Sequence, residues 1–520
     1  MHRRHLLLGS AATLALPGLS SAATRSSFVH AEASVASLSQ AMAAGKLTSE
    51  RLVQDYLARI AALDKAGPRL NSVIELNPEA RQIARALDAE RKAGKLRGPL
   101  HGIPVLLKDN IATGDQMHTT AGSLALADLR VSRDAHLVQR LRAAGAVILG
   151  KTNLSEWANI RSTRSVSGWS GRGGLTRNPY ALDRSTSGSS SGTGAAIAAD
   201  LATLGVGTET DGSIVSPASI CGLVGLKPTM GRVSRDGVIP IAHSQDTAGP
   251  MTRSVADAAL LYAAMCGPDA ADAVTQGAPT AAGRLDPASL KGARLGVARN
   301  YFTGFDEADA VIEAAIAKLR ELGAEIVDNI ELAPVGYGDP ELSVLLYELK
   351  ADLAQWLKTF APGHKMQTLA DVIAFNKAHR DKEMGWFGQE LFEKAEALGD
   401  LSAPAYREAL AACGKGAREE GLDKAIKAHR LDALIAPTGG PAWLIDPVAS
   451  DHYGASFSTP AAVAGYPHLT VPAGFVRGLP LGLSFVGPAW SEWKLLSYGQ
   501  AFEQSTRHRR PPGFVKKTVP

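Results

Sequence analysis

Apolar side chains recur at helical spacing in the first part of the chain, from about residue 34 to residue 95. Thr48 and Ser49 precede one such stretch and have the short polar side chains that cap the first turn of a helix. The apolar positions of this stretch are Leu52, Val53, Tyr56, Leu57, Ile60 and Leu63. The pattern predicts amphipathic helices that each pack one face against a core.

After Gly98 and Pro99 the pattern changes to short apolar runs separated by glycine and by helical stretches. Buried strands are predicted at 103–107, 146–149, 204–206, 295–298, 433–436, 469–471 and 481–486. Helical spacing returns between several of these runs, for example over 136–144 and 254–265. Strands that alternate with helices predict an α/β fold in which helices sandwich a parallel or mixed sheet.

The rhythm changes again in the last third of the chain. Residues from about 340 to 430 are strongly helical in pattern, with Tyr347, Leu353 and Trp356 among their apolar anchors. Strand-like runs resume at Leu431. We interpret the helical stretch as an insertion, or cap, within a single domain that spans about residues 30–520.

The first 23 residues have the pattern of an export signal: a basic start, a short apolar stretch and small residues at its end. Arg3 and Arg4 resemble the pair of a twin-arginine signal, which exports folded protein. A membrane anchor or a cytoplasmic amphipathic start is the alternative, but the apolar stretch is shorter than the roughly 20 residues of a spanning helix, and Pro17 and Gly18 interrupt it. The sequence therefore predicts a periplasmic or secreted protein that has no membrane anchor after signal removal.

Charge and cysteine content argue against several classes of protein. The 55 Lys and Arg against 51 Asp and Glu give a net charge of +4, and no basic stripe suits a phosphate backbone, so nucleic acid is not an expected partner. Cys221, Cys266 and Cys413 have no C-x-x-C spacing and are predicted to be buried, inert thiols, with a single disulfide among them as the alternative. The 13 histidines include no H-E-x-x-H motif, so no metal is expected.

Two loops rich in glycine and serine, 187–194 and 205–213, are the richest candidates for chemistry. A phosphate-binding loop would require a lysine after Gly192 or Gly194, and none is there. A nucleophile elbow matches formally with Ser190 at its centre, but the residues before it are too polar for the buried strand that an elbow follows. A flexible linker fits poorly, because a tight alanine-rich helix is predicted from Thr193 to about Leu201.

The second loop offers backbone donors as well as a hydroxyl. It leaves a predicted buried strand before Gly207 and ends at Ser213. The N–H groups that could converge on a developing oxyanion belong to Thr210, Asp211, Gly212 and Ser213. This arrangement suits acyl transfer.

The two loops, together with Lys108-Asp109-Asn110 at a predicted strand end, resemble the amidase signature family. The likeness covers about residues 40–270 and 430–500, and the serines Ser189 and Ser213 have that family's separation, 213 − 189 = 24. Bacterial peptide amidases are the most similar members, over the segments 208–213, 233–237, 244–250, 387–390 and 464–467. Asp211 and Ser187 stand where many members have glycine, although peptide amidases share the aspartate; both positions bear on substrate fit.

The resemblance implies Ser213 as nucleophile, Ser189 as proton bridge and Lys108 as base, with a cis peptide bond adjoining Ser189. A serine hydroxyl is a weak nucleophile until a base takes its proton, and a lysine amine is a base only when neutral. The apolar run 103–107 supplies the burial that would lower the pKa of Lys108. Taken singly, Lys108 would be a surface lysine, Ser189 a helix cap and Ser213 a residue after a turn, so their joint spacing favours catalysis.

Three neighbouring side chains have weaker interpretations. Asp109 and Asn110 are expected to orient the strand end rather than to react. Trp157 is expected either to line a pocket or to belong to the core.

The activity that the resemblance implies is hydrolysis of a linear carboxamide, with release of ammonia from the C-terminal amide of a peptide, and without cofactor or metal. Alternatives within the family are amidases for small aliphatic, aryl or fatty-acyl amides, and the amidotransferase subunit that acts on transfer RNA, which the export signal disfavours. An alternative of another class is a non-catalytic amide- or peptide-binding protein on the same scaffold. The expected partner is a small-molecule or peptide amide, and no oligomeric state is predicted.

Overall fold

The computed structural model describes residues 28–332 and 338–518. Contacts along the chain divide it into two units, Met1–Ala31 and Glu32–Pro520. In the described part of the first unit, the Ala31 N–H donates to the Phe28 carbonyl at 3.0 Å. The predicted export signal, residues 1–23, lies outside the described residues and stays a prediction.

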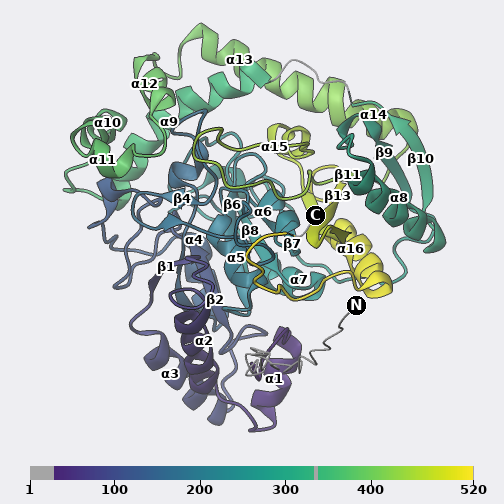
Figure 1. Ribbon diagram of the computed structural model, residues 1–520, viewed down its shortest axis with the longest axis horizontal. Helices are drawn as coiled ribbons and strands as arrows, with labels where there is room; N and C mark the ends of the chain where they lie inside the picture. Colours follow the sequence, from purple (N-terminus) through teal and green to yellow (C-terminus); the bar gives the residue numbers. More distant parts are fainter. Residues whose placement is uncertain (1–27, 333–337, 519–520) are drawn as a thin grey trace, which may run out of the picture. The chain divides into compact units, whose positions relative to one another are not determined.

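The second unit is built on a mixed sheet that has eleven strands among the described residues (Figure 1). Across the sheet they are β1 (Val73–Leu76), β3 (Val147–Thr152), β2 (Pro104–Lys108), β6 (Leu204–Glu209), β8 (Thr247–Thr252), β7 (Val224–Lys227), β12 (His468–Val476), β13 (Leu479–Val486), β11 (Ala433–Pro437), β9 (Arg294–Ala298) and β10 (Glu325–Ile330). Every residue of β2, β3, β6, β7 and β8 is buried, so other elements cover both faces of this part of the sheet. The predicted α/β fold is confirmed.

The helices cover the sheet and form the segment between β10 and β11. They are α1 (Val35–Ala43), α2 (Ser49–Leu63), α3 (Ala80–Lys92), α4 (His136–Ala143), α5 (Ser191–Ala198), α6 (Val215–Ile220), α7 (Val255–Met265), α8 (Asp306–Glu321), α9 (Gly338–Phe360), α10 (Leu369–Ala378), α11 (Arg380–Glu383), α12 (Glu390–Ala397), α13 (Pro404–Gly414), α14 (Asp423–His429), α15 (Thr459–Ala464) and α16 (Glu492–Thr506). A π-helical turn, Lys415–Leu422, joins α13 to α14. A separate two-stranded sheet pairs β4 (Trp169–Ser170) with β5 (Gly174–Leu175).

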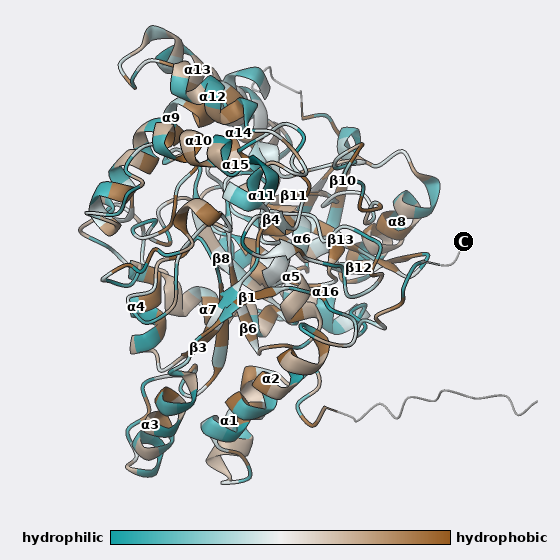
Figure 2. Cartoon of the chain, turned by 60° about the vertical axis from the view of Figure 1, so that its left-hand side comes forward, coloured by the Kyte–Doolittle hydropathy of each residue, from teal (hydrophilic) through white to brown (hydrophobic). Residues whose placement is uncertain are grey.

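Helix α2 shows why the amphipathic pattern predicted these elements. The Thr48 side chain accepts a hydrogen bond from the Arg51 N–H at 3.1 Å and so caps the helix, as predicted. Four of the six predicted core positions of α2 are fully buried, namely Leu52, Val53, Tyr56 and Ile60. The outer helices α3 and α4 keep hydrophilic residues, which are teal in Figure 2.

Four strands of the sheet escape prediction because non-local pairing creates them. Strand β1 interrupts the helical first part of the chain and pairs antiparallel with β3 at the sheet edge. Strand β8 has no apolar run, and its pairing with β6 and β7 is what holds it extended. Strand β7 is short, and β10 is an edge strand with exposed residues. Helix α5 also begins earlier than predicted, at Ser191.

The helical segment from α9 to α14 contacts the loops beside the central strands through a buried charge cluster. Glu383 of α11 is fully buried and accepts hydrogen bonds from the Leu124 N–H (2.6 Å) and the Ser123 hydroxyl (3.2 Å). The buried Arg161 guanidinium lies 3.4 Å from the Glu383 carboxylate and 4.3 Å from the centre of the Phe387 ring. The helical pattern predicted for 340–430 is present, and its interpretation as an insertion within one domain stays a prediction.

The three cysteines, Cys221, Cys266 and Cys413, are buried free thiols, as predicted, and no disulfide joins them. None of the described helices combines the length and the apolar composition that a bilayer-spanning segment requires.

Candidate active site

Lys108 ends β2, between β3 and β6, and its side chain is fully buried. Its Nζ lies 2.7 Å from Ser189 Oγ and donates to both oxygens of Thr208, to the hydroxyl at 2.9 Å and to the carbonyl at 3.1 Å. Burial lowers the pKa of Lys108 to about 7, although the negative charges of Asp246 and Glu209 oppose the shift. The site therefore holds an amine that can be neutral near pH 7.

Ser189 lies in the first loop, immediately before α5, and is fully buried. The Gly188–Ser189 peptide bond is cis. A Cβ at Gly188 would come within 2.1 Å of Ser155 Oγ, so only glycine fits there. The Ser155 N–H donates to the Ser189 carbonyl at 3.1 Å, which holds the loop against Ser155.

Ser190 joins the two loops. Its N–H donates to the Ser213 carbonyl at 3.1 Å. Its hydroxyl donates to the Thr208 carbonyl at 3.1 Å and accepts from the Thr208 N–H at 3.2 Å. These three bonds keep the loop that carries Ser213 beside the loop that carries Ser189.

Ser213 follows β6 by one turn and is 7% exposed, whereas Lys108 and Ser189 are 0% exposed. Glu209, the last residue of β6, accepts the N–H groups of Ile214 (2.7 Å) and Val215 (3.0 Å) in one carboxylate oxygen and so fixes the chain directly after Ser213. The Ser213 hydroxyl makes no hydrogen bond to any residue that the structure describes. Of the three predicted catalytic residues, Ser213 is thus the one that keeps some exposure.

Three consecutive backbone amides that end at Ser213 have no partner among the described residues. The N–H groups of Asp211, Gly212 and Ser213 donate to none of the described residues. Gly212 has a left-handed φ of 76°, and a Cβ there would lie 2.9 Å from Ser458 Oγ, which explains the glycine. The Thr210 hydroxyl donates to Asp246 at 2.5 Å and so anchors the start of this turn. Unused N–H groups beside a hydroxyl are what an oxyanion hole requires.

The structure thus brings Lys108 and Ser189 into direct contact and places Ser213 in the adjoining loop. Among the described contacts, no hydrogen bond joins the Ser189 and Ser213 hydroxyls. The cis bond adjoining Ser189, which the family resemblance implied, is confirmed. The interpretation of Ser189 as a helix cap is wrong, because Ser190 is the N-cap residue of α5.

The other three predicted neighbours play different parts. The Asn110 side chain donates to the Thr208 hydroxyl at 2.9 Å and so supports the residue that contacts Lys108. Asp109 is buried, and the Arg172 guanidinium lies 3.4 Å from its carboxylate. Trp157 is 2% exposed, and its ring centre lies 5.7 Å from that of Phe392, so it belongs to the core.

Sequence reasoning missed Thr208, Ser190 and Glu209, which position the predicted residues. Thr208 and Glu209 both lie in the segment 208–213 that carries the family likeness, so that motif held the signal. In the sequence, Ser190 stands out only as the formal centre of a nucleophile elbow.

His243, Glu348 and Asp352 form the cluster of possible metal ligands in the described part of the chain, with ligand atoms within 4.8 Å of one another. His243 Nδ1 lies 2.9 Å from an Asp352 oxygen and 3.5 Å from Glu348. Glu348 also accepts from the Tyr406 hydroxyl at 2.7 Å. The contact with Asp352 raises the pKa of His243, so ion pairing accounts for this cluster.

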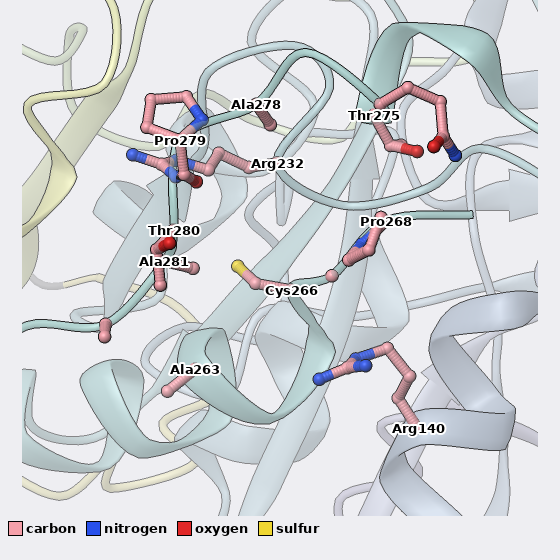
Figure 3. Close-up of a pocket in the computed structure, with 13 residues that line it drawn as sticks. Arg140, Arg232, Ala263, Cys266, Pro268, Thr275, Ala278, Pro279, Thr280 and Ala281 are labelled. Carbon is pink, nitrogen blue, oxygen red and sulfur yellow. Dashed lines mark hydrogen bonds between the residues drawn. The ribbon is translucent and has the colours of Figure 1, made fainter. Parts of the chain in front are cut away.

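A cavity of about 520 Å³ lies at the end of α7 (Figure 3). Arg140, Arg232 and Cys266 are among the residues that line it, and Lys108, Ser189 and Ser213 are not. The Arg232 guanidinium already lies 3.3 Å from the buried Glu492 carboxylate. The cavity is therefore separate from the candidate active site.

The sequence pattern of the Amidase family matches residues 51–496. A probable amidase of Arabidopsis thaliana is 39% identical, over 98% of this chain and 97% of its own. With this fold and this pair of loops, the chain belongs to the amidase family.

Two solved structures are more similar still. Native peptide amidase from Stenotrophomonas maltophilia is 54% identical, with a TM-score of 0.89 over 94% of this chain and 99% of that one. The peptide amidase PAM in complex with the competitive inhibitor chymostatin is 54% identical, with a TM-score of 0.90 over 93% and 99%. The chain is an amidase enzyme that resembles peptide amidase.

Proposed function

We propose that the protein hydrolyses the C-terminal carboxamide of peptides to a free carboxylate and ammonia, with Ser213 as nucleophile, Ser189 as proton bridge and Lys108 as base. The observation that carries this proposal is the 2.7 Å contact between a buried lysine amine and the Ser189 hydroxyl. Similarity to peptide amidase, including its complex with chymostatin, supports a peptide as the acyl part of the substrate.

The neutral form of Lys108 fits its three contacts. A neutral amine has two N–H donors and one lone pair. The two donors go to the hydroxyl and the carbonyl of Thr208, and the lone pair then accepts the Ser189 O–H. The amine is thereby oriented to receive a proton from Ser189.

The reaction then follows the logic of serine acyl transfer. Ser213 Oγ attacks the carboxamide carbon while its proton passes to Ser189, and the proton of Ser189 passes to Lys108. The negative charge on the carbonyl oxygen is held by the N–H groups of the turn from Thr210 to Ser213. As the C–N bond breaks, the proton returns through Ser189 to the leaving nitrogen, and ammonia departs.

The second half of the reaction reuses the same groups. A water molecule attacks the ester carbon on Ser213 and gives one proton through Ser189 to Lys108. When the ester bond breaks, that proton restores the Ser213 hydroxyl, and the peptide leaves with a free carboxylate. No cofactor or metal enters either half.

A panel of amides that measures released ammonia tests the substrate class. We expect kcat/KM to be at least about tenfold higher for peptide amides than for acetamide, benzamide and a fatty-acyl amide, because binding of the distant parts of a substrate lowers the barrier. Equal or higher kcat/KM values for the simple amides would contradict the peptide assignment. They would favour an amidase for small aliphatic, aryl or fatty-acyl amides. Absence of turnover with every amide, together with failure to react with a fluorophosphonate probe, would favour the non-catalytic binding protein.

We also propose that the protein is exported, because Arg3 and Arg4 precede a short apolar stretch at the N-terminus. Changing both arginines to lysine keeps the charge and removes the pair. In a bacterial host with the twin-arginine pathway, we expect the natural sequence to give amidase activity outside the cytoplasm. The double variant should stay in the cytoplasm. Equal distribution of the two proteins would contradict this route.

A further inference from the structure

Asp211 presents an unused carboxylate oxygen in the turn that ends at Ser213. Its Oδ2 accepts a hydrogen bond from the Thr459 hydroxyl at 2.6 Å, and the Ser458 hydroxyl also contacts the carboxylate. Its Oδ1 is buried, and no described residue donates to it. A buried oxygen without a donor is rare in folded proteins, so this one calls for an explanation.

Several surrounding groups act on the Asp211 carboxyl. Burial raises the pKa of this carboxyl, and the Ser458 and Thr459 side chains together with the positive charge of the buried Lys227 oppose part of that rise. Two further groups face Asp211 from other elements: Glu209 at the end of β6 and Tyr453 in the loop before α15.

Glu341, in the first turn of α9, is a second acidic neighbour of Asp211 and is 8% exposed. Its Oε1 accepts from the Gln245 side chain at 2.9 Å, and the same Gln245 nitrogen lies 3.4 Å from the Thr210 carbonyl. Burial, with a further contribution from the Asp211 charge, raises the pKa of Glu341 to about 8. Glu341 is therefore mainly neutral at pH 7, and it faces Cys413 of α13 on another side.

Asp211 lies two residues before Ser213 and is therefore close to a bound substrate. Two residues of chain span at most about 7 Å, so Asp211 stays near the carbon that Ser213 attacks. In a peptide amide, the N–H of the last residue is separated from that carbon by a single Cα. A simple aliphatic amide has no donor at this place.

Building on the proposed function, we infer that Asp211 Oδ1 accepts a hydrogen bond from the N–H of the substrate's last residue. Asp211 is then a specificity residue that distinguishes peptide amides from amides without that donor. Asp211 Oδ1 would gain the partner that no described residue supplies, and the substrate N–H would gain a carboxylate oxygen as its acceptor.

A matched pair of substrates tests this inference. N-acetyl-phenylalaninamide carries the N–H, and O-acetyl-phenyllactamide has an ester oxygen in its place with the same side chain and the same carboxamide. For the natural enzyme we expect kcat/KM to favour the N–H substrate by roughly 10- to 100-fold, the range for a hydrogen bond to a charged group.

Asp211→Asn should remove or invert this ratio. The amide oxygen of Asn would take the Thr459 and Ser458 donors, which leaves its NH₂ group where the free carboxylate oxygen stood. An NH₂ repels the substrate N–H but can donate to the ester oxygen. Glu341→Gln should keep the ratio at pH 7, because glutamine resembles the protonated carboxyl and retains the contact with Gln245.

Thermal melting of each variant establishes that it is folded, and Asp211→Gly provides the same test if the Asn variant does not fold. A ratio near one in the natural enzyme, or a ratio that Asp211→Asn leaves unchanged, overturns the inference. Failure of the natural enzyme to turn over either substrate rejects the proposed function and this inference with it. Turnover of both substrates at equal rates rejects the inference alone.

Discussion

Replacing Ser213 by alanine should lower kcat for a peptide amide by about 10⁴-fold or more, while the protein stays folded. The variant loses the oxygen that forms the acyl bond, and Lys108, Ser189 and the backbone donors cannot replace it. Because the Ser213 hydroxyl makes no hydrogen bond to a described residue, its removal should change stability by less than about 1 kcal/mol. Ammonia release measures the first effect and thermal melting the second.

The control for this variant is Ser402→Ala, an exposed serine in the loop between α12 and α13. Like Ser213→Ala, this variant removes a serine hydroxyl oxygen, but at a position far along the chain from the candidate site. It should leave kcat unchanged. Turnover at the natural rate by Ser213→Ala would show that another group is the nucleophile. Loss of melting cooperativity together with activity would instead assign Ser213 a structural role.

The rate of the natural enzyme should rise with pH and level off above the pKa of Lys108, about 7. Below that pKa the amine is charged and cannot accept a proton, so kcat/KM should fall about tenfold for each pH unit. Lys108→Ala should lower kcat by about 10²- to 10⁴-fold, the usual contribution of a positioned base. Stopped assays of ammonia from pH 5 to pH 9 measure both effects.

The variant Asp246→Asn tests whether the inflection of the pH profile belongs to Lys108 or to another titratable group nearby. The negative charge of Asp246 raises the pKa of Lys108, so its removal should move the inflection to lower pH. Burial raises the pKa of Asp246 itself to about 6, and a profile that reported Asp246 would lose its inflection in this variant. A flat pH profile across pH 5–9 would contradict the role of Lys108.

The matched control for Lys108→Ala is Lys365→Ala, at an exposed lysine.

The parts of the site that sequence predicted well are those carried by one short segment. The apolar run before Lys108 predicted both a strand and a buried amine, and the two loops stood out by their glycine and serine content. The parts that were missed depend on pairing between distant segments. Strand β8 has no apolar run, and Ser190 gains its significance only because it reaches Thr208 and Ser213 across two loops.

Glu341 shows the limit of local patterns most clearly. In sequence it is one acidic residue at the start of a long helical stretch. Folding brings it close enough to Asp211 for the two carboxyl groups to interact, with Gln245 as a hydrogen-bonded link to the Thr210 carbonyl. No periodicity or motif signals such a contact, because it depends on how α9 packs against the loop that carries Gln245.

Strand alignment has a practical consequence for studies of folding. Strands β2 and β6 are parallel neighbours, with Leu107 opposite Val206, and Lys108 then meets Thr208 just beyond. A slip of β2 by one residue would turn the Lys108 side chain to the opposite face of the sheet and take it away from Ser189. Ammonia release by refolded protein would thus report correct alignment of the central strands. Circular dichroism cannot make this distinction, because a misaligned sheet has the same strand content.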